Sequence, residues 1–319
     1  MRVAVLDDYQ HAAAGFADWG SLDAEVTFFD RHLADDDDLV TTLAGYDVIM
    51  AMRERTPFPA ELLTRLTDLR LLVTTGSGNA AIDLKAAAAL DITVCATGYL
   101  SNAASEHTWA MILAAARHLP AEFASVAAGG WQRTVGIGLA GRTLGLMGLG
   151  RLGSAVAKVG LAFDMDVIAW SQHLTPERAA EIGVRAVSKA ELLAQSDVLS
   201  VLLVLSGRTR GLIGASELRA MKPSAILVNS SRGPIVDETD LIQALRDGVI
   251  AGAALDVFDV EPLPADHPFR SLPTVVLTPH IGYVIDEQYR IFYTDAVEDI
   301  ARFAAGTPVR VITPERPRV

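Results

Sequence analysis

The sequence predicts an α/β fold made of two doubly wound parallel-sheet domains. Three observations support this prediction. Short apolar runs alternate with helical stretches from the first residues to residue 277. The length of 319 residues exceeds what one hydrophobic core usually holds, so two domains are expected. A glycine-rich turn at residues 148–153 separates an apolar run from a helical one, as at the start of a βα unit.

Residues 1–100 predict the first domain. Its candidate strands are almost continuously apolar, which is typical of a parallel sheet covered on both faces. The acidic run 35–38 precedes a helical pattern, and consecutive carboxylates do not converge on one ion. We therefore interpret the run as a solvated helix start and expect no metal site. The candidate strands are Val3–Leu6, Val26–Phe29, Val48–Met52, Leu71–Thr75 and Ile92–Cys95.

Small residues follow the fourth candidate strand. Gly76, Ser77, Gly78 and Asn79 lie at its carboxyl end, where backbone N–H groups of a parallel sheet can bind a carboxylate. An ordinary turn has the same composition. The residues alone leave both interpretations open.

A long helical pattern at residues 101–117 is expected to begin the second domain, with Asn102 or Ser105 as its cap. His107 follows Glu106, but sequence neighbours do not face each other on a helix. We interpret His107 as a structural or interface residue.

The glycine turn predicts a dinucleotide cofactor. Gly148 allows the tight turn, Gly150 lets a pyrophosphate approach the main chain, and Gly153 lets the helix pack closely on the strand. Free N–H groups at the helix start would face the anion. A glycine-rich loop without a ligand is the alternative, but the strand before it and the helix after it favour the cofactor.

The second strand of this unit, Asp166–Trp170, ends at Ser171. A unit selective for NAD usually carries an acidic residue there, which holds the ribose hydroxyls. Ser171 offers no carboxylate to repel a 2′-phosphate, and the adjacent Gln172 and His173 supply no arginine or lysine to attract one. The cofactor is therefore NAD or NADP, with NAD slightly favoured.

Three polar residues follow later candidate strands. Arg232, Glu261 and His280 lie beyond carboxyl ends of presumed parallel strands, where open α/β sheets bind ligands. Each alone has a structural interpretation: a surface arginine, a solvated glutamate, a helix-cap histidine. Together they predict hydride transfer, with a histidine carrying the proton, a glutamate orienting it and an arginine binding a carboxylate or carbonyl. The strands are Val198–Val204, Ala225–Asn229, Ala253–Asp256 and Val275–Leu277.

The segments that carry these residues resemble the D-isomer-specific 2-hydroxyacid dehydrogenases. The resemblance covers almost the whole chain in the same order, and it rests on four linked motifs at residues 144–153, 228–238, 253–262 and 278–282. It implies a flavodoxin-like substrate domain at residues 1–100 plus 284–319, an inserted Rossmann NAD(P)-binding domain at 101–283, and a homodimer. The helical pattern after residue 285 is accordingly expected to return to the first domain.

The resemblance also implies the residue roles. Arg232, Glu261 and His280 are the expected catalytic residues. Ser77, Gly78 and Arg232 are expected to bind the substrate, with the glycine loop on its carboxylate, and Asp256 to face the nicotinamide carboxamide. The remaining expected cofactor contacts come from Gly148, Gly150, Arg151, Leu152, Gly153, Ser171, Ser230 and Gly282.

The chain departs from the family pattern in one further place, and two arginines near the expected cleft have two interpretations. Leu202, Leu203 and Val204 stand where the family often has a His-x-Pro segment, so a cofactor-facing loop is expected to differ. Arg53 and Arg55 are interpreted as surface residues, with a phosphate or second carboxylate as the alternative ligand.

The amino-acid composition indicates which binding partners and which cellular location to expect. The formal net charge of −12 disfavours nucleic acid and anionic membranes. The single cysteine, Cys95, excludes an intrachain disulfide, and no apolar stretch at the N-terminus resembles a signal peptide. We expect a cytoplasmic location.

We therefore expect an NAD(P)-dependent enzyme that interconverts a small D-2-hydroxy acid and its 2-keto acid, similar to glyoxylate/hydroxypyruvate reductases. A phosphoglycerate dehydrogenase-like enzyme is one alternative. A non-catalytic NAD(H)-sensing co-regulator of the same fold is the other.

Overall fold

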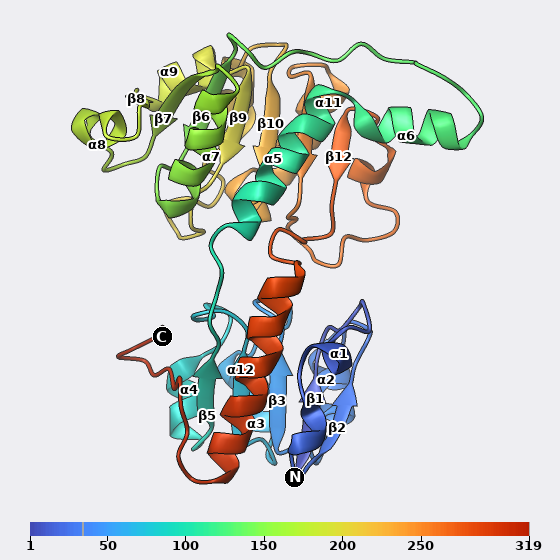
Figure 1. The fold of residues 1–319 in the computed structure, drawn as a ribbon, viewed down its shortest axis with the longest axis vertical. Coiled ribbons are helices and arrows are strands. Elements are labelled where there is room, and N and C mark those ends of the chain that lie inside the picture. The colour runs from blue at the N-terminus through green and yellow to red at the C-terminus, as the bar shows by residue number, and fades with distance from the viewer. Residues whose placement is uncertain (34, 319) are drawn as a thin grey trace. The chain divides into compact units, whose positions relative to one another are not determined.

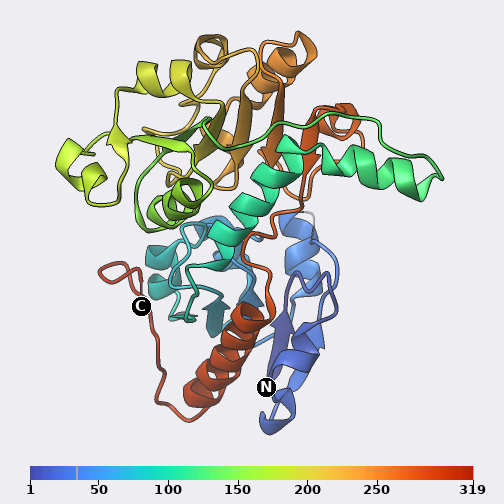
Figure 2. The same cartoon turned by 45° about the horizontal axis from the view of Figure 1, so that its top comes forward.

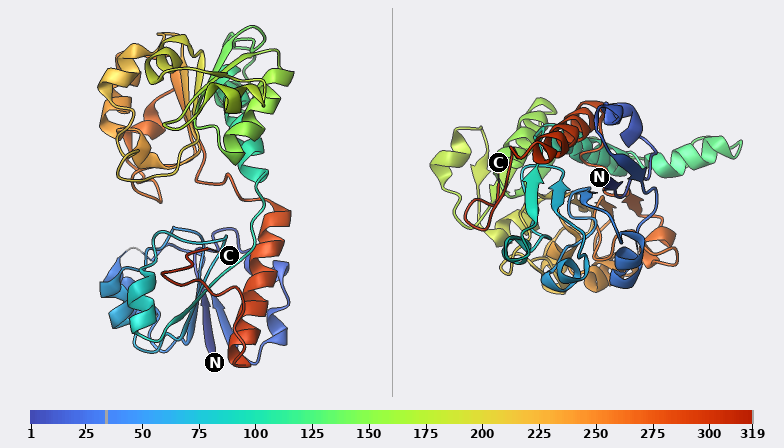
Figure 3. Two further views of the ribbon diagram at one scale, coloured as in Figure 1. Left: turned by 90° about the vertical axis from the view of Figure 1, so that its left-hand side faces the viewer. Right: turned by 90° about the horizontal axis from the view of Figure 1, so that it is seen from below.

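The structure is a computed structural model that describes residues 1–33 and 35–318. The chain divides into two compact units (Figure 1). Unit 1 comprises Met1–Leu100 and Val284–Val319, and unit 2 comprises Ser101–Tyr283. Each unit contains one parallel sheet with helices on both faces (Figure 3). The predicted fold class is confirmed.

Unit 1 contains a five-stranded sheet in the order β2-β1-β3-β4-β5, the flavodoxin-like order. Helices α1 and α12 cover one face, and α2, α3 and α4 cover the other (Figure 3). The strands are β1 (Arg2–Val5), β2 (Glu25–Phe28), β3 (Val48–Ala51), β4 (Leu71–Thr74) and β5 (Thr93–Ala96). The helices are α1 (Ala13–Phe16), α2 (Asp36–Thr42), α3 (Ala60–Arg65), α4 (Leu84–Ala89) and α12 (Asp286–Ala304), with a 3₁₀ turn at Trp19–Ser21.

The strands of unit 1 form where they were predicted because nearly every residue of β1, β3 and β4 is buried. The acidic run begins α2, with the side chain of Asp35 accepting a hydrogen bond from Asp38 N, as expected of a helix start. Past α12 the chain returns to the sheet (Figure 3), where Val311 pairs with Cys95 on the edge strand β5.

Unit 2 contains a seven-stranded parallel sheet in the order β12-β11-β10-β9-β6-β7-β8. With β6 counted as the first strand, the six strands from β11 to β8 have the Rossmann order, and β12 is an added edge strand. The strands are β6 (Thr143–Met147), β7 (Asp166–Trp170), β8 (Arg185–Ala186), β9 (Val198–Val201), β10 (Ile226–Asn229), β11 (Gly252–Leu255) and β12 (Val275–Leu277).

Two cores lie on the two faces of this sheet. One contains residues of α5 and α7, and the other contains residues of α9, α10 and α11. The helices of unit 2 are α5 (Ala103–Ala116), α6 (Leu119–Ala127), α7 (Arg151–Ala162), α8 (Pro176–Ala180), α9 (Lys189–Gln195), α10 (Ala215–Ala220) and α11 (Glu238–Arg246), with 3₁₀ turns at Gly233–Ile235 and Pro268–Ser271.

Two expectations about elements were wrong in detail. The strand expected at Val198–Val204 ends at Val201, because Leu202 to Val204 leave the sheet and Val204 is exposed. Neither expected cap forms at α5: Asn102 occupies the cap position with helical backbone angles and makes no side-chain cap, and Ser105 lies inside the helix. The two-residue strand β8 was not predicted.

Helix α6 and the segment after it extend away from the rest of unit 2 (Figure 2). They expose large apolar side chains: Phe123 is 67% exposed, Val126 58%, Trp131 75% and Val135 92%. Within residues 1–33 and 35–318, no helix is long and apolar enough to cross a membrane.

Candidate active site

The sheet of unit 2 brings the predicted polar residues to one edge. Its strand pairs are all parallel, so their carboxyl ends share an edge. The glycine turn follows β6, Arg232 follows β10, Glu261 lies beyond β11, and His280 follows β12. The parallel sheet therefore brings to one edge residues that lie far apart in the chain: Gly148 and His280 are separated by 132 positions.

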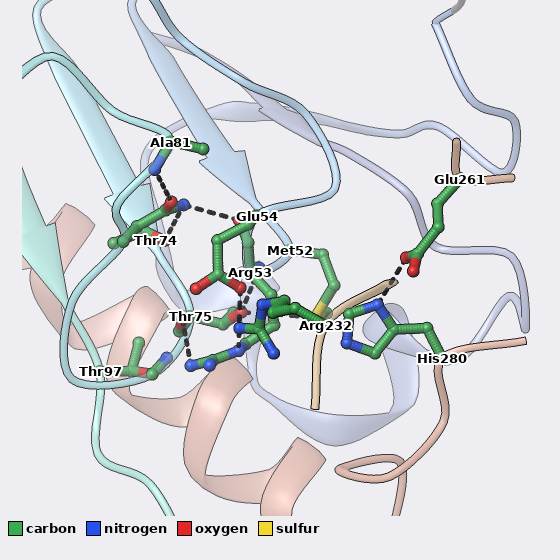
Figure 4. Close-up of polar contacts among 12 residues, drawn as sticks. Met52, Arg53, Glu54, Thr74, Thr75, Ala81, Thr97, Arg232, Glu261 and His280 are labelled. Atoms are coloured by element: carbon green, nitrogen blue, oxygen red, sulfur yellow. Dashed lines mark hydrogen bonds and ion pairs between the residues drawn. The ribbon is translucent and has the colours of Figure 1, made fainter. Parts of the chain in front are cut away.

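His280 and Glu261 form a close pair (Figure 4). His280 Nδ1 lies 2.5 Å from Glu261 Oε2, and Glu261 Oε1 accepts a hydrogen bond of 2.9 Å from Phe258 N. The two side chains are 17% and 25% exposed. Across the described part of the chain, His280 Nε2 has no hydrogen-bond partner. The pair thus fixes one ring nitrogen and leaves the other for a ligand.

The backbone of His280 is unusual. Its φ of 55° lies in the left-handed region, which a residue other than glycine adopts only where its surroundings impose it. Asp256 supplies much of that constraint. Its Oδ1 accepts from Thr278 Oγ1 at 2.6 Å and from Ile281 N at 2.9 Å, and its Oδ2 accepts from Gly282 N at 2.9 Å. The carboxylate therefore holds both sides of the turn that carries His280.

His107 completes this network from α5. Its Nε2 lies 3.2 Å from Asp256 Oδ1 and 3.1 Å from Thr278 Oγ1. Burial alone would raise the pKa of Asp256, but the hydrogen bond and charge of His107, with the Thr278 and Ile281 donors, outweigh it and keep the pKa below its usual value. His107 thus occupies a structural position, as the sequence predicted, and it supports the turn of His280.

Arg232 lies in a loop whose main chain accepts hydrogen bonds from nearby side chains. Asn229 Nδ2 donates to Arg232 O at 3.0 Å, and Arg232 Nη1 donates to Ser231 O at 2.7 Å. A Cβ on Gly233 would come within 2.1 Å of the Phe258 carbonyl carbon, so only glycine lets this loop approach the segment that leads to Glu261. Arg232 is half-buried.

The glycine turn has three glycines with three different environments. Gly148 has a φ of 113°, and a Cβ there would lie 2.6 Å from Leu202 O. A Cβ on Gly153 would lie 2.2 Å from Gly148 O, so this glycine lets α7 pack on the turn. A Cβ on Gly150 would meet nothing within 4 Å. The protein's own packing does not require Gly150, whereas a pyrophosphate seated at the start of α7 would.

The other expected cofactor residues lie around this turn or on neighbouring loops. Arg151 is exposed in the first turn of α7, and Leu152 is partly buried, with its side chain packed against the core. Ser230 follows β10, and its Oγ lies 2.7 Å from Thr108 Oγ1. Gly282 donates its N–H to Asp256.

Ser171 is half-buried at the end of β7, next to Gln172. The sequence offered no cation beside these residues, but the structure supplies one from a distant segment. Arg208 Nη1 donates to Gln172 Oε1 at 3.0 Å. Since 36 residues separate the partners, no local pattern could have indicated this contact.

In unit 1, the Gly76–Asn79 loop follows β4 and is held by hydrogen bonds at its two ends. Gly76 N donates to Thr97 Oγ1 at 2.7 Å, and Asn79 Nδ2 donates to Arg53 O at 2.6 Å (Figure 4). Between them, the N–H groups of Ser77 and Gly78 have no acceptor anywhere in residues 1–33 and 35–318. Two adjacent free donors are what an anion-binding loop requires.

Two other segments border this loop. Arg53 has a φ of 54°, and its Nη1 would lie 1.8 Å from a Cβ on Gly76, so the guanidinium rests on the bare backbone of that glycine. The C-terminal segment also reaches it: Pro317 O would lie 2.5 Å from a Cβ on Gly78, and Arg318 Cγ 3.0 Å. No pattern in the sequence indicates this second contact.

Together, the parallel sheet with the Rossmann order, the open space above Gly150 and the His280–Glu261 pair define an NAD(P)-dependent oxidoreductase. The comparisons with known proteins specify the family. Residues 109–282 match the model of the D-isomer specific 2-hydroxyacid dehydrogenase NAD-binding domain. The chain belongs to the D-isomer specific 2-hydroxyacid dehydrogenase family, and the resemblance that its motifs suggested is confirmed.

Two relatives and one solved structure illustrate the similarity. The chain is 43% identical over 256 residues to a glyoxylate reductase of Aeropyrum pernix, covering 77% of this chain and 76% of that protein. It is 38% identical over 314 residues to a D-3-phosphoglycerate dehydrogenase of Archaeoglobus fulgidus, covering 97% of this chain but 58% of that protein. The structure of a phosphoglycerate oxidoreductase from Vibrio cholerae superposes with a TM-score of 0.92 at 36% identity, covering 96% of this chain and 99% of that one.

Proposed function

We propose that this enzyme reduces a small 2-keto acid, such as glyoxylate or hydroxypyruvate, to the D-2-hydroxy acid. The observation that carries the proposal is the His280–Glu261 pair at the sheet edge of the glycine turn. Within the described residues, His280 Nε2 has no hydrogen-bond partner and can face a ligand. The similarity to a glyoxylate reductase over three quarters of both chains supports a small substrate.

The proposed roles follow from the geometry of each side chain. Bound nicotinamide cofactor supplies the hydride for reduction. His280 Nε2 gives a proton to the oxygen that becomes the hydroxyl, while Glu261 holds Nδ1 and so fixes the orientation of the ring. Arg232 binds the carboxylate or the polarised carbonyl through its planar guanidinium. Asp256 keeps the turn of His280 in place.

We assign the two domain functions accordingly. Unit 2 is the dinucleotide-binding domain: the main chain at Gly148, Gly150 and Leu152 and the start of α7 receive the pyrophosphate. Unit 1 is the substrate domain. The free N–H groups of Ser77 and Gly78 bind the substrate carboxylate, because each can donate without breaking a bond within the protein.

A phosphoglycerate dehydrogenase-like activity is the second candidate. Sequence similarity over 97% of this chain and the close superposition on a phosphoglycerate oxidoreductase support it. Under this alternative, Arg53 and Arg55 of unit 1, which are both half-buried, would bind a substrate phosphate. Relative activity on hydroxypyruvate and its phosphate ester distinguishes the two substrates.

The test is the oxidation of NADH or NADPH, followed by absorbance, with glyoxylate, hydroxypyruvate, pyruvate and phosphohydroxypyruvate. We expect turnover with at least one small monoanionic acid. His280→Asn should lower kcat at least about 100-fold, since asparagine suits the left-handed backbone but carries no comparable acid. The control His11→Asn changes an exposed histidine with a φ of 52°. Normal turnover in His280→Asn contradicts the assignment, and no turnover with any substrate favours a co-regulator.

We further propose a cytoplasmic homodimer. The exposed apolar side chains of α6 and the segment after it, Phe123, Val126, Trp131 and Val135, form the surface expected to be covered by a second copy. Light scattering after size exclusion should give twice the chain mass, and Phe123→Glu with Trp131→Glu should give a monomer. A monomeric parent protein contradicts the proposal.

A further inference from the structure

Three segments of unit 2 meet beside the glycine turn. In the sheet order β9-β6-β7, the strand that leads into the turn lies between β9 and β7. The segments that follow β9 and β7 therefore flank the turn on its two sides. The hydrogen bond from Arg208 to Gln172 joins these two flanking segments.

Arg208 is held in this place by an ordered turn. Ser206 N donates to Thr209 Oγ1 at 2.8 Å, Thr209 Oγ1 donates to Val204 O at 2.7 Å, and Arg210 N donates to Ser206 O at 3.0 Å. These bonds leave Arg208 at the tip of the turn with its side chain exposed. It forms no ion pair with any residue of 1–33 or 35–318. The guanidinium is therefore a positive charge without a protein counter-ion.

We infer that Ser171 and Arg208 form a binding site for the 2′-phosphate of NADP(H), so that the enzyme prefers NADP(H) to NAD(H). The end of β7 is where a Rossmann domain contacts the adenine ribose. A carboxylate there accepts the ribose hydroxyls and repels a phosphate, whereas Ser171 offers a neutral hydroxyl. The planar fork of an arginine matches a phosphate. Among residues 1–33 and 35–318, the only hydrogen-bond partner of the Arg208 side chain is the neutral amide of Gln172, which a dianion can displace.

This inference deepens the proposed function, because it concerns the cofactor of the same reaction. It also reverses the slight preference for NAD that the sequence supported. That preference depended on the absence of a cation next to Ser171 in the chain, and the fold brings Arg208 there from the loop after β9.

The first test measures binding without turnover. We expect NADPH to bind more tightly than NADH by fluorescence titration, and 2′-AMP to bind more tightly than 5′-AMP by calorimetry. Arg208→Ala should weaken NADPH binding about tenfold or more, with NADH affinity changed less than about twofold. The NADPH advantage should shrink as salt is raised, because the site is exposed.

Arg210→Ala is the matched control. Arg210 carries the same charge two residues further along the loop, and its charge acts on Asp259. This variant should leave the ratio of NADPH to NADH affinity unchanged. Ser171→Asp should reverse the preference by repelling the phosphate and accepting the ribose hydroxyls.

Two results would overturn the inference. One is a parent protein that binds NADH at least as tightly as NADPH, and the other is an Arg208→Ala variant that loses both cofactors equally. Neither result affects the proposed reduction of 2-keto acids, which is measured by turnover with either cofactor. Conversely, a parent protein that binds NADPH but turns over none of the 2-keto acids would refute the proposed reaction without contradicting the proposed cofactor site.

Discussion

Glu261 holds His280 through one carboxylate oxygen and the backbone of Phe258 through the other, at 2.5 Å from Nδ1 and 2.9 Å from N. This arrangement gives the glutamate a fixed position of its own, independent of the histidine. The imidazole is thereby oriented by a partner that does not itself need to move. Under the proposed reaction, Glu261 is therefore a positioning residue that acts on the substrate through His280.

Glu261→Gln should therefore lower kcat about 10- to 100-fold, with little change in cofactor affinity. The amide keeps the size of the side chain but replaces a charged hydrogen-bond acceptor by a neutral group. Steady-state kinetics and NAD(P)H titration measure the two effects. Glu61→Gln, at an exposed position of α3, is the control. Equal kcat in both variants would remove Glu261 from the mechanism.

Gly150 and Gly153 should respond oppositely to alanine. Gly153→Ala places a methyl group 2.2 Å from Gly148 O, so it should destabilise unit 2 by about 1–3 kcal/mol. Gly150→Ala has open space and a φ of −80°, so its melting temperature should be unchanged or slightly higher. Its cofactor affinity should nevertheless fall, because the methyl group enters the pyrophosphate position. A Gly150→Ala protein with normal NAD(P)H binding would contradict this site.

Features of the fold and the candidate site that depend on residues near each other in the chain could be predicted from the sequence, whereas features that depend on contacts between distant segments could not. The glycine turn and most strands were predictable because they rest on local spacing and on continuous apolar runs such as Leu71–Thr74. Arg232, Glu261 and His280 were predictable because each follows a strand of a parallel sheet. The distances between these side chains, and the hydrogen bond from Phe258 N to Glu261, could not be predicted, because the conformation of a loop depends on packing between segments.

Other features had no local signal at all. The contact of Arg208 with Gln172 arises from strand order, and β8 has only two residues, too few for a periodic pattern. Pro317 lies against Gly78 after the chain has paired with the sheet edge through an antiparallel bridge between Val311 and Cys95. These contacts become visible only when the chain is folded.

Asp256→Asn should destabilise the turn of His280 and reduce stability by about 2–4 kcal/mol. An amide nitrogen would face the N–H of Ile281 or Gly282, which now donate to the two carboxylate oxygens. The native pKa of Asp256 lies below its usual value, so the stabilisation is complete above that usual value and is lost as the pH falls through the native pKa. Urea denaturation at pH 7 and at about pH 3 measures both effects. A difference between parent and variant that does not shrink in acid would contradict the assignment.

Asp299 should give the opposite pH dependence in unit 1. Its burial raises its pKa to about 8, despite the ion pair of 3.0 Å with Arg310 Nε, while the charge of Asp295 adds to the rise. The native state therefore holds a proton that the unfolded chain releases at lower pH, and stability falls as the pH rises towards 8. Asp299→Asn should remove this decline. Glu298→Gln, which changes an exposed partner of the same arginine, should keep it. Identical pH profiles in parent and Asp299→Asn would refute the shift.

The C-terminal segment should influence the affinity for the substrate. Pro317 and Arg318 lie against Gly78, whose free N–H is proposed to bind the substrate carboxylate. Arg318 is exposed and has no ion pair within the described residues, so its charge is available to an anion near the loop. Arg318→Ala should therefore raise KM for a 2-keto acid that carries a phosphate group, such as phosphohydroxypyruvate, more than KM for glyoxylate. For the loss of one exposed charge, we expect KM for phosphohydroxypyruvate to rise about fivefold more than KM for glyoxylate.

Arg316→Ala is the matched control, because Arg316 lies in the same segment. Within the described residues, its hydrogen bonds all use its main chain and join it to Thr313. This variant removes an equal charge and should change both KM values alike. NADPH affinity should be the same in parent, Arg316→Ala and Arg318→Ala, since the cofactor binds through unit 2. If the two variants change the KM ratio equally, the effect is one of net charge, and the contact of the C-terminal segment with Gly78 has no part in substrate selection.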